Sequence, residues 1–392
     1  MLSPKAANLG NLHGLVLIVL TSLAAVVGGC KTEESKPAVN PTTAPTAAAT
    51  PAATSSAQPA LATPALAAPA PAARPASPAP DKLRLGYFAN FTHAQAVLGV
   101  ANGDFATAVA PAKVETKVFN AGPSLIEALF AGEIDIGYIG PGPALNGFAK
   151  SKGAGVRVIA GAAANGVLVV ARKDSGITRL DDIKGKRIAT PQLGNTQDIA
   201  AKAYVRSLGQ TDVGNVKAVP NAEQVGQIGR GEFDVAWAPE PWGSLLVKEA
   251  GATVLAKEES LWPEGAFAIT VVITTPEFLA KHPDTVERFL KVHVALTDRL
   301  AKDPTKELPA LKAALLALTN KGLPAGVLES SVANTRFTTD PLRHTFTKFA
   351  GWAYDLGIAK DRTDPAALFD TATLDRLKAQ GGAGTPKKGL DD

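Results

Sequence analysis

The chain has 392 residues, which is more than the roughly 250–300 residues that one hydrophobic core usually serves, so we expect more than one folding unit. Its formal net charge is +4, and the basic residues are spread along the chain instead of forming one block. The sequence has no basic run with interleaved aromatic residues, which argues against nucleic acid as a partner.

The first 29 residues are typical of a secretory signal peptide. Lys5 precedes an apolar run over residues 15–27, and two glycines follow directly before Cys30, the only cysteine. This order resembles the bacterial lipobox, in which the cysteine is lipidated and becomes the mature amino terminus. A transmembrane anchor is the first alternative, but the run is short against the ~20 residues that a membrane helix needs. A buried core cysteine is the second. We expect a lipid on Cys30 and a site of action outside the cytoplasmic membrane.

The segment that follows is expected to be a tether. Residues 30–80 consist largely of Pro, Ala, Thr and Ser, with few large apolar side chains. Such a segment cannot bury enough surface to offset the entropy lost on ordering, and its prolines favour an extended chain. At the other end, residues 379–392 are rich in Gly and Lys, and we expect a disordered tail there.

From residue 81 onward, strand-like and helix-like segments alternate, which predicts βα units and a mostly parallel sheet. One predicted helix begins at His93 and another at Ser124, where Ser124 and Glu127 have the spacing of a capping box. The predicted strands of this part are 83–88, 113–119, 156–162 and 167–172.

A second set of βα units comes next. Strands are predicted at 187–190 and 216–219, each followed by a helix, and 267–274 is a third strand. Beyond it the pattern is almost wholly helical, with amphipathic stripes around His293 and Phe349. We predict a second lobe, residues 173–266, inserted between the two parts of a first lobe, 81–172 and 267–378. Two crossings between the lobes would form a hinge.

An internal repeat also predicts two similar lobes. Gly-Glu-Ile-Asp-Ile-Gly-Tyr at 132–138 returns as Gly-Glu-Phe-Asp-Val-Ala-Trp at 231–237, and prolines follow both copies. Ligands bind at the carboxyl ends of the strands in open α/β sheets, so two facing lobes would form a cleft. Asp135 and Asp234 recur at the strand starts, where a role in the turn is simpler than acid–base chemistry.

Four polar loops at predicted strand ends form the candidate site. They span 90–93, 120–124, 140–143 and 190–198, and each precedes a predicted helix. Helix amino termini present unpaired N–H groups and a partial positive charge, so they bind small anions without lysine or arginine. His93 is the only basic side chain in these loops, which suits a compact oxyanion such as sulfonate better than a polyphosphate. For Ser124, Thr196 and the asparagines, helix capping is an equally good interpretation.

Single residues also allow both a functional and a structural interpretation. His93 has no His-x-x-x-His spacing or carboxylate partner, so we favour a donor or capping role over metal binding. Strand alternation turns Trp237 inward and leaves Trp242 to line the cleft. His293 lies on an apolar helix stripe and is expected to be packed and hydrogen-bonded. The sequence has no nucleophile elbow, phosphate-binding loop or metal-like carboxylate pair, so we expect neither an enzyme nor a cofactor or metal.

Several segments together carry a family resemblance. They are LRLGYFANFTHAQA (83–96), FNAGPS (119–124), GEIDIGYIGP (132–141), ATPQLGNTQD (189–198) and WAPEPWG (237–243). In their residues and in their order along the chain, these segments resemble substrate-binding proteins of the nitrate, sulfonate and taurine class of ABC importers. The resemblance is strongest to the aliphatic-sulfonate binders. The likeness covers nearly everything from residue 83 to about 300.

The resemblance implies an α/β, two-lobed type II periplasmic-binding-protein fold with a discontinuous first lobe. It also implies capture of a small anionic solute in the cleft and delivery to an ABC permease, by a monomeric protein in the periplasm or on the outer face of the cytoplasmic membrane. The ligand-binding residues that it supports are Thr92, His93, Asn120, Gly140, Gly194, Asn195, Thr196, Gln197 and Trp242.

The ligand stays open at this point. Relatives bind nitrate, bicarbonate, taurine, alkanesulfonates or thiamine-pyrimidine precursors on the same fold, and a fold by itself does not settle function. A pyrimidine-synthesising relative provides an enzyme alternative, which would need metal- and cofactor-binding histidines and cysteines. A purely structural lipoprotein is the third interpretation.

Overall fold

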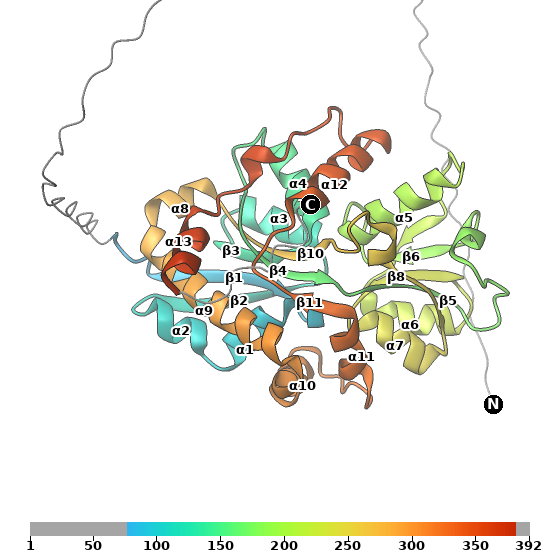
Figure 1. The fold of residues 1–392 in the computed structure, drawn as a ribbon, viewed down its shortest axis with the longest axis horizontal. Coiled ribbons are helices and arrows are strands. Elements are labelled where there is room, and N and C mark those ends of the chain that lie inside the picture. Colours follow the sequence, from blue (N-terminus) through green and yellow to red (C-terminus); the bar gives the residue numbers. More distant parts are fainter. Residues whose placement is uncertain (1–76, 382–392) are drawn as a thin grey trace, which may run out of the picture. The chain divides into compact units, whose positions relative to one another are not determined.

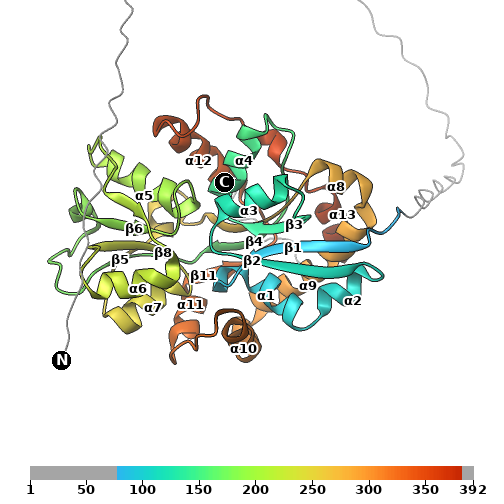
Figure 2. The same ribbon diagram turned by 180° about the vertical axis from the view of Figure 1, so that it is seen from behind.

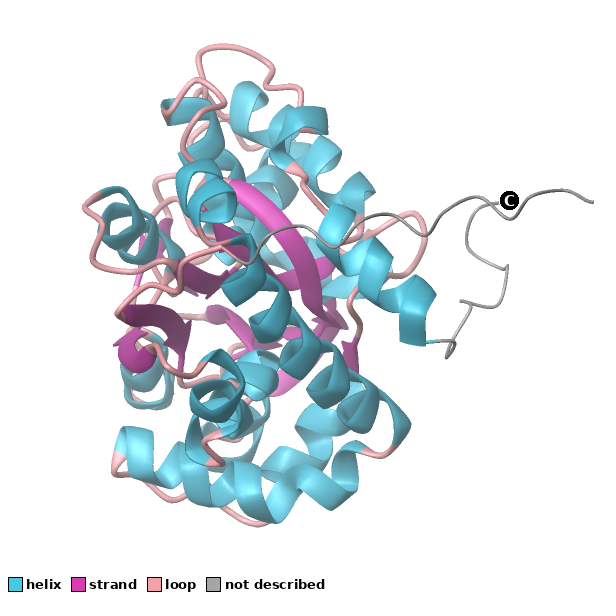
Figure 3. Cartoon of the chain, turned by 90° about the vertical axis from the view of Figure 1, so that its left-hand side faces the viewer, coloured by secondary structure: helices cyan, strands magenta, loops and turns pink. Residues whose placement is uncertain are grey.

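A computed structural model describes residues 77–381, and these contain two β-sheets with helices on both faces of each (Figure 1). The predicted signal peptide, Cys30, most of the predicted tether and most of the predicted tail lie outside the described residues. The first sheet has the strand order β11-β4-β10-β3-β1-β2 and the second has the order β7-β6-β8-β5-β9. Figure 2 shows both sheets from behind, and Figure 3 shows the strands as a layer between helices.

The first sheet is formed by β1 (Lys82–Phe88), β2 (Lys113–Phe119), β3 (Ile136–Ile139), β4 (Arg157–Asn165), β10 (Ala268–Thr274) and β11 (Thr335–Phe337). The second is formed by β5 (Val167–Ala171), β6 (Ile188–Thr190), β7 (Val216–Ala218), β8 (Val235–Pro239) and β9 (Thr253–Lys257). The helices are α1 (Ala94–Ala101), α2 (Asp104–Val109), α3 (Gly122–Phe130), α4 (Pro141–Lys150), α5 (Thr196–Ser207), α6 (Asn221–Gly229), α7 (Trp242–Ala250), α8 (Pro276–Lys281), α9 (Pro283–Lys302), α10 (Leu308–Thr319), α11 (Val327–Asn334), α12 (Arg343–Asp355) and α13 (Ala372–Gly381).

The two sheets are built to one plan. β1 pairs in parallel with β2 and β3, and β6 pairs in parallel with β7 and β8. Each set is joined by an antiparallel strand, β10 beside β3 and β5 beside β8. The order β2-β1-β3-β10-β4 in one sheet therefore corresponds to β7-β6-β8-β5-β9 in the other. These central strands are buried and rich in Val, Ile and Ala, as strands with both faces covered must be.

The repeated aspartates hold equivalent strands together. Asp135 Oδ2 accepts hydrogen bonds from the backbone N (2.8 Å) and Nε (3.0 Å) of Arg84. Asp234 Oδ2 accepts the same two bonds from Arg187, at 3.1 Å and 3.0 Å. These bonds to Arg187 hold the pKa of Asp234 at about 2. The expectation that both aspartates serve the strand start is confirmed.

The chain crosses between the sheets earlier than we expected. β4 ends at Asn165 in the first sheet, and β5 begins at Val167 in the second. Gly166 stands between them with φ of 73°, a left-handed conformation that costs glycine little. The first crossing thus lies at Gly166 instead of Arg172. The apolar run 167–172 could not show this, because a buried strand reads the same in either sheet.

Both ends of the folded part also differ from expectation. Ser77 N donates a hydrogen bond to Asp284, and His282 Nδ1 donates to Pro78 O at 2.9 Å. The last residues of the predicted tether therefore contact the start of α9. At the other end, α13 continues to Gly381, beyond the predicted start of the tail at Ala379. Burial of Leu377 anchors its last turn.

Helix α3 begins before the predicted capping box. Its first residue is Gly122, with Pro123 in the first turn, where the fixed φ of proline suits a helix start. Ser124 Oγ donates to Ala121 O at 2.9 Å instead of accepting an N–H. The capping box predicted from Ser124 and Glu127 is therefore wrong, because the N-cap of the helix is Ala121, three positions before Ser124.

Candidate functional site

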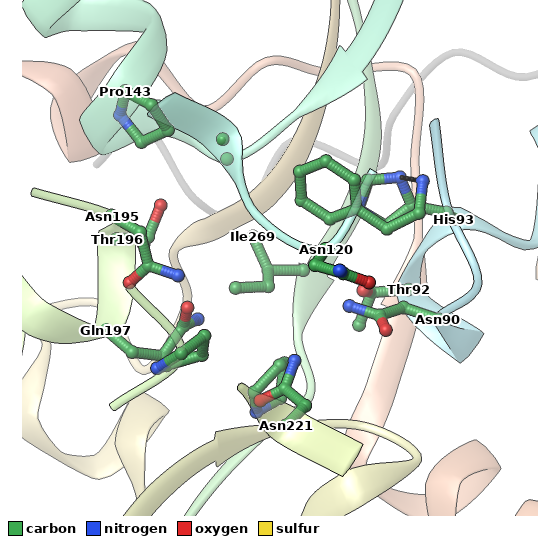
Figure 4. A pocket seen from close by; sticks show the side chains of 15 residues that line it. Asn90, Thr92, His93, Asn120, Pro143, Asn195, Thr196, Gln197, Asn221 and Ile269 are labelled. Carbon is green, nitrogen blue, oxygen red and sulfur yellow. Dashed lines mark hydrogen bonds between the residues drawn. The ribbon is translucent and has the colours of Figure 1, made fainter. Parts of the chain in front are cut away.

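A cavity lies where the carboxyl ends of strands from both sheets come together (Figure 4). Its lining follows β1, β2 and β3 in the first sheet and β6, β7 and β8 in the second. It is lined by Phe88, Asn90, Thr92, His93, Asn120, Gly122, Gly140, Pro143, Pro191, Asn195, Thr196, Gln197, Asn221, Pro239 and Ile269. The volume is about 20 Å³, far below the roughly 300–1,000 Å³ of pockets for drug-sized ligands, so the cavity suits a compact group.

The structure brings most of the predicted site residues together. The lining includes Thr92, His93, Asn120, Gly140, Asn195, Thr196 and Gln197. Gly194 lies outside it, and its N–H donates to Asp198 Oδ2 at 2.8 Å. Trp242 is not among the lining residues either, but its indole Nε1 donates to Oδ1 of the lining residue Asn90 at 2.8 Å.

Helix amino termini from both sheets surround the cavity. Helices α3 and α6 begin with the lining residues Gly122 and Asn221, and Gly140 is the N-cap of α4. Asn195 is the N-cap of α5, and its Oδ1 accepts from Asp198 N at 3.1 Å. Helix starts carry unpaired N–H groups and partial positive charge, so together they favour an anion. The capping interpretation of Asn195 is confirmed as well.

His93 contributes a neutral hydrogen-bond donor. Its ring is buried and stacks on Phe88 with the ring centres 4.4 Å apart. Nδ1 accepts the backbone N–H of Phe88 at 3.3 Å, so Nε2 carries the proton of the neutral ring. Burial lowers the pKa of His93 to about 3, which keeps the ring uncharged at physiological pH. This geometry fits the donor role that we favoured from the sequence.

Two lining amides each have a buried atom with no hydrogen-bond partner among residues 77–381. These atoms are Nε2 of Gln197 and Oδ1 of Asn221. Both residues are buried, and both labelled side chains border the cavity in Figure 4. An unpaired buried polar group costs about 1–3 kcal/mol, so such groups are expected to meet a polar partner. An anionic solute in the cavity would supply an acceptor for Gln197 Nε2.

Hydrogen bonds join the two sides of the cavity. Gly142 N donates to Thr196 Oγ1 at 3.4 Å, and Asn146 Nδ2 donates to Gly194 O at 3.4 Å. A Cβ at Gly140 would lie 2.2 Å from Thr196 Oγ1. The two sides can approach this closely only because residue 140 has no side chain.

A buried carboxylate, Glu240, follows the lining residue Pro239 at the end of β8. Glu240 accepts hydrogen bonds from Ser244 Oγ (2.9 Å), Ser331 Oγ (3.1 Å) and Asn334 Nδ2 (2.7 Å). It joins the start of α7 to α11. Burial raises the pKa of Glu240, an effect that these hydrogen bonds oppose.

Trp237 and His293 lie outside the cavity and are part of the core. Trp237 is fully buried and donates to Glu258 Oε2 at 2.6 Å, so its predicted inward orientation is confirmed. Burial raises the pKa of Glu258 to about 7. His293 Nε2 donates to Gly161 O at 2.8 Å, which leaves Nδ1 to accept from Tyr138 Oη at 2.8 Å. His293 is packed and hydrogen-bonded, as expected.

Sequence reasoning missed Asn221. The offset of the internal repeat is 231 − 132 = 99, and 122 + 99 = 221, so Asn221 is the counterpart of Gly122. Carrying the first loop through the repeat would have found it. The apolar lining, Phe88 and Ile269 among it, gave no comparable signal, because strand residues at a cavity look like core residues.

In 77–381, no three His, Cys, Asp or Glu side chains gather in a way that could hold a metal ion. None of the helices in this part of the chain is both long and apolar enough to cross a bilayer.

Comparison with known proteins places the chain in a family. Residues 76–314 match the model of the NMT1-like family, and the chain belongs to that family. The taurine-binding periplasmic protein of Escherichia coli (strain K12) is 29% identical over 185 residues, covering 46% of this chain and 55% of that protein. A putative aliphatic sulfonates-binding protein of Bacillus subtilis (strain 168) is 32% identical over 188 residues, covering 46% and 53%. The chain thus spans about half the length of these relatives.

A solved structure shows the same fold. The alkanesulfonate-binding protein SsuA from Xanthomonas axonopodis pv. citri, bound to MOPS, has a TM-score of 0.63 at 22% identity. The match covers 75% of this chain and 99% of that one. The predicted periplasmic-binding-protein fold, with strands of the first sheet before and after those of the second, is confirmed.

Proposed function

We propose that this chain is the solute-binding protein of an ABC importer and that it captures a small organic anion, an aliphatic sulfonate. The observation that carries the proposal is the cavity itself, where helix starts from two sheets surround a space lined by amides, hydroxyls and one neutral imidazole. Such a lining stabilises a compact anion through hydrogen bonds and helix dipoles, without a cationic side chain.

A sulfonate group matches this lining. It has one negative charge and three oxygens that only accept hydrogen bonds, while the cavity offers donors on several sides. In the proposed complex, His93 Nε2 and Gln197 Nε2 donate to the sulfonate together with N–H groups of the helix starts. The names of the relatives, which bind taurine or aliphatic sulfonates, support this choice over nitrate or a thiamine-pyrimidine precursor.

The two sheets are proposed to act as lobes that close on the solute. With the crossing at Gly166, the first lobe consists of 77–165 and 268–381 and the second of 167–257, which adjusts the division predicted at 172 and 267. Closure would change dihedral angles near Gly166 and in 258–267 while both sheets stay rigid. The hydrogen bond between Gly142 and Thr196 would then form on closure.

The cellular setting is part of the proposal. The order of charged, apolar and small residues before Cys30 supports a lipid anchor, and the Pro-rich tether would let the lobes reach a permease in the cytoplasmic membrane. A periplasmic relative supports an extracytoplasmic location. We propose that the protein acts as a monomer and is not an enzyme.

Ligand-induced thermal stabilisation tests the function. The mature chain, produced without the signal peptide, is heated with alkanesulfonates, taurine, nitrate or pyrimidines. A ligand at about 100 times its Kd stabilises the folded state by ~2.7 kcal/mol, which raises the Tm by about 5 °C. We expect this shift with sulfonates. No shift with any sulfonate, or a shift with pyrimidines alone, would contradict the proposal.

A further inference from the structure

We propose that the aliphatic chain of the sulfonate lies in a second cavity between β2 and β7. This inference rests on the proposed function and names the part of the site that selects sulfonates by their tails. Inorganic anions such as nitrate would leave the second cavity unused.

The second cavity adjoins the first. It has a volume of about 400 Å³, and it shares Asn120 and Pro191 with the cavity at the helix starts. Asn120 follows β2 and Pro191 follows β6, so both lobes contribute to the shared boundary. A solute whose anionic group lies at the helix starts can therefore extend past these two residues into the larger space.

The walls of this second cavity are largely apolar. Val118 and Phe119 come from β2, Ala121 follows them, and Ala218 and Pro220 lie at the end of β7. Val118 is 42% exposed, and Ala218 and Pro220 are also exposed. This surface gains from contact with an alkyl chain, because covering apolar area removes it from water.

The polar residues that line the second cavity are uncharged and offer no ion pair to a charged group of the solute. Ser124 Oγ already donates to Ala121 O at 2.9 Å, and Gln192 is a neutral amide. An ammonium group at the end of the tail would meet no carboxylate among the lining residues of this cavity. A methyl or methylene group fits these walls better than a charge does.

A third cavity lies on another side of the site. It has a volume of about 740 Å³, and its lining combines the charged residues Glu127, Lys150, Lys152, Lys360 and Asp361 with apolar side chains such as Ile126, Phe130, Leu193 and Ile358. Hydrogen bonds from Gly142 to Thr196 and from Asn146 to Gly194 join α4 to the start of α5 on that side. Because these hydrogen bonds join the two sides of the site there, we assign the tail to the cavity between β2 and β7.

The position at the sheet edges allows tails of different length. β2 is the outer strand of the first sheet and β7 is the outer strand of the second. The cavity between them is therefore open at the rim, and a chain longer than the cavity can continue into solvent. Val118 and Ala218, one from each lobe, are the residues that we assign to tail selectivity.

Calorimetric titration with sulfonates of increasing length tests the inference. The mature chain is titrated with methanesulfonate through hexanesulfonate. We expect the affinity to rise about two- to fourfold for each added methylene until the cavity is filled, and then to level off. Taurine should bind more weakly than propanesulfonate, because its ammonium replaces a methyl group on the apolar wall.

Two variants locate the effect. Val118→Asn and Ala218→Asn place neutral amides at exposed positions, so neither substitution changes the packing of the core. Each should lower the ratio of pentanesulfonate to methanesulfonate affinity about tenfold. Val254→Asn is the matched control, because Val254 is 43% exposed on the outer strand β9 and lies outside the three cavities described. It should leave the ratio unchanged.

The outcomes separate this inference from the proposed function. An affinity for sulfonates that does not depend on chain length would overturn the tail site and leave the proposed function standing. A ratio that stays at the wild-type value in both variants would also overturn it. Failure to bind any sulfonate would remove the proposed function and this inference together.

Discussion

At the residue scale, the cavity depends on positions where a side chain would not fit. Gly140 lies between β3 and α4 as the N-cap of α4, and Thr196 at the start of α5 approaches it closely. The neighbouring polar groups then line a space small enough to surround a compact anion. The sequence placed glycine at 140, but only the structure shows what faces it.

Gly140→Ala is predicted to weaken sulfonate binding. The added Cβ would lie 2.2 Å from Thr196 Oγ1 and would hold the two sides of the cavity apart. Because hydrogen bonds to the anion lengthen when the sides separate, we expect about a tenfold loss of affinity in calorimetric titration. Gly229→Ala is the control, since a Cβ there meets nothing within 4 Å. Equal affinity in the two variants would show that close approach at Gly140 is not needed.

At the element scale, each lobe is held by an equivalent arginine–aspartate pair at the start of its strands. Arg84 with Asp135 joins β1 to β3, and Arg187 with Asp234 joins β6 to β8. The repeat in the sequence marked the aspartates but not their arginine partners. Those lie on other strands, and strand pairing alone brings them together.

Asp234→Asn is predicted to destabilise the protein at neutral pH. The pKa of Asp234 is lowered from 3.8 to about 2, so the charged carboxylate stabilises the fold above pH 3.8 and this contribution is lost as the pH falls to 2. Urea denaturation should therefore show a lower midpoint for the variant at pH 7 and a smaller difference from wild type at pH 3. The exposed residue Asp298 provides the control, Asp298→Asn. If the difference in urea midpoint between Asp234→Asn and the wild type grew as the pH fell, the result would contradict a stabilising ion pair between Asp234 and Arg187.

At the scale of the whole molecule, the proposed lobes need a membrane position from which to reach a permease. Cys30 and the Pro-rich tether are the part of the chain that would provide it. A single acyl chain binds membranes only weakly, so stable anchoring needs more than one lipid chain. The lipobox-like order before Cys30 predicts such a modification.

Cys30→Ser is predicted to release the protein from membranes. The wild-type chain, expressed in bacteria with its signal peptide, should partition into the detergent phase, and the variant should appear in the aqueous phase. Sulfonate binding by the two should agree within a factor of two, because the cavity lies in residues 77–381. Detergent-phase partitioning of both proteins would show that the anchor is something other than lipid on Cys30.

Sequence alone was sufficient for features that local patterns encode. The βα alternation, the repeat at 132–138 and 231–237 and the polar loops before helices are each read from neighbouring residues, and they led to the fold and to most of the cavity lining. Helix starts could be placed to within one turn, because strand ends, prolines and small polar residues act over that distance; the start of α3 at Gly122 instead of Ser124 is an example.

Only the tertiary structure decided matters that depend on residues far apart in the chain. It assigned β5 to the second sheet, turned Trp242 toward Asn90 and brought Asn221 to the cavity. It also placed a cavity between β2 and β7, which are outer strands of different sheets. The physical reason is that periodicity shows which side of an element is buried, whereas the partner of that side is set by packing between distant segments.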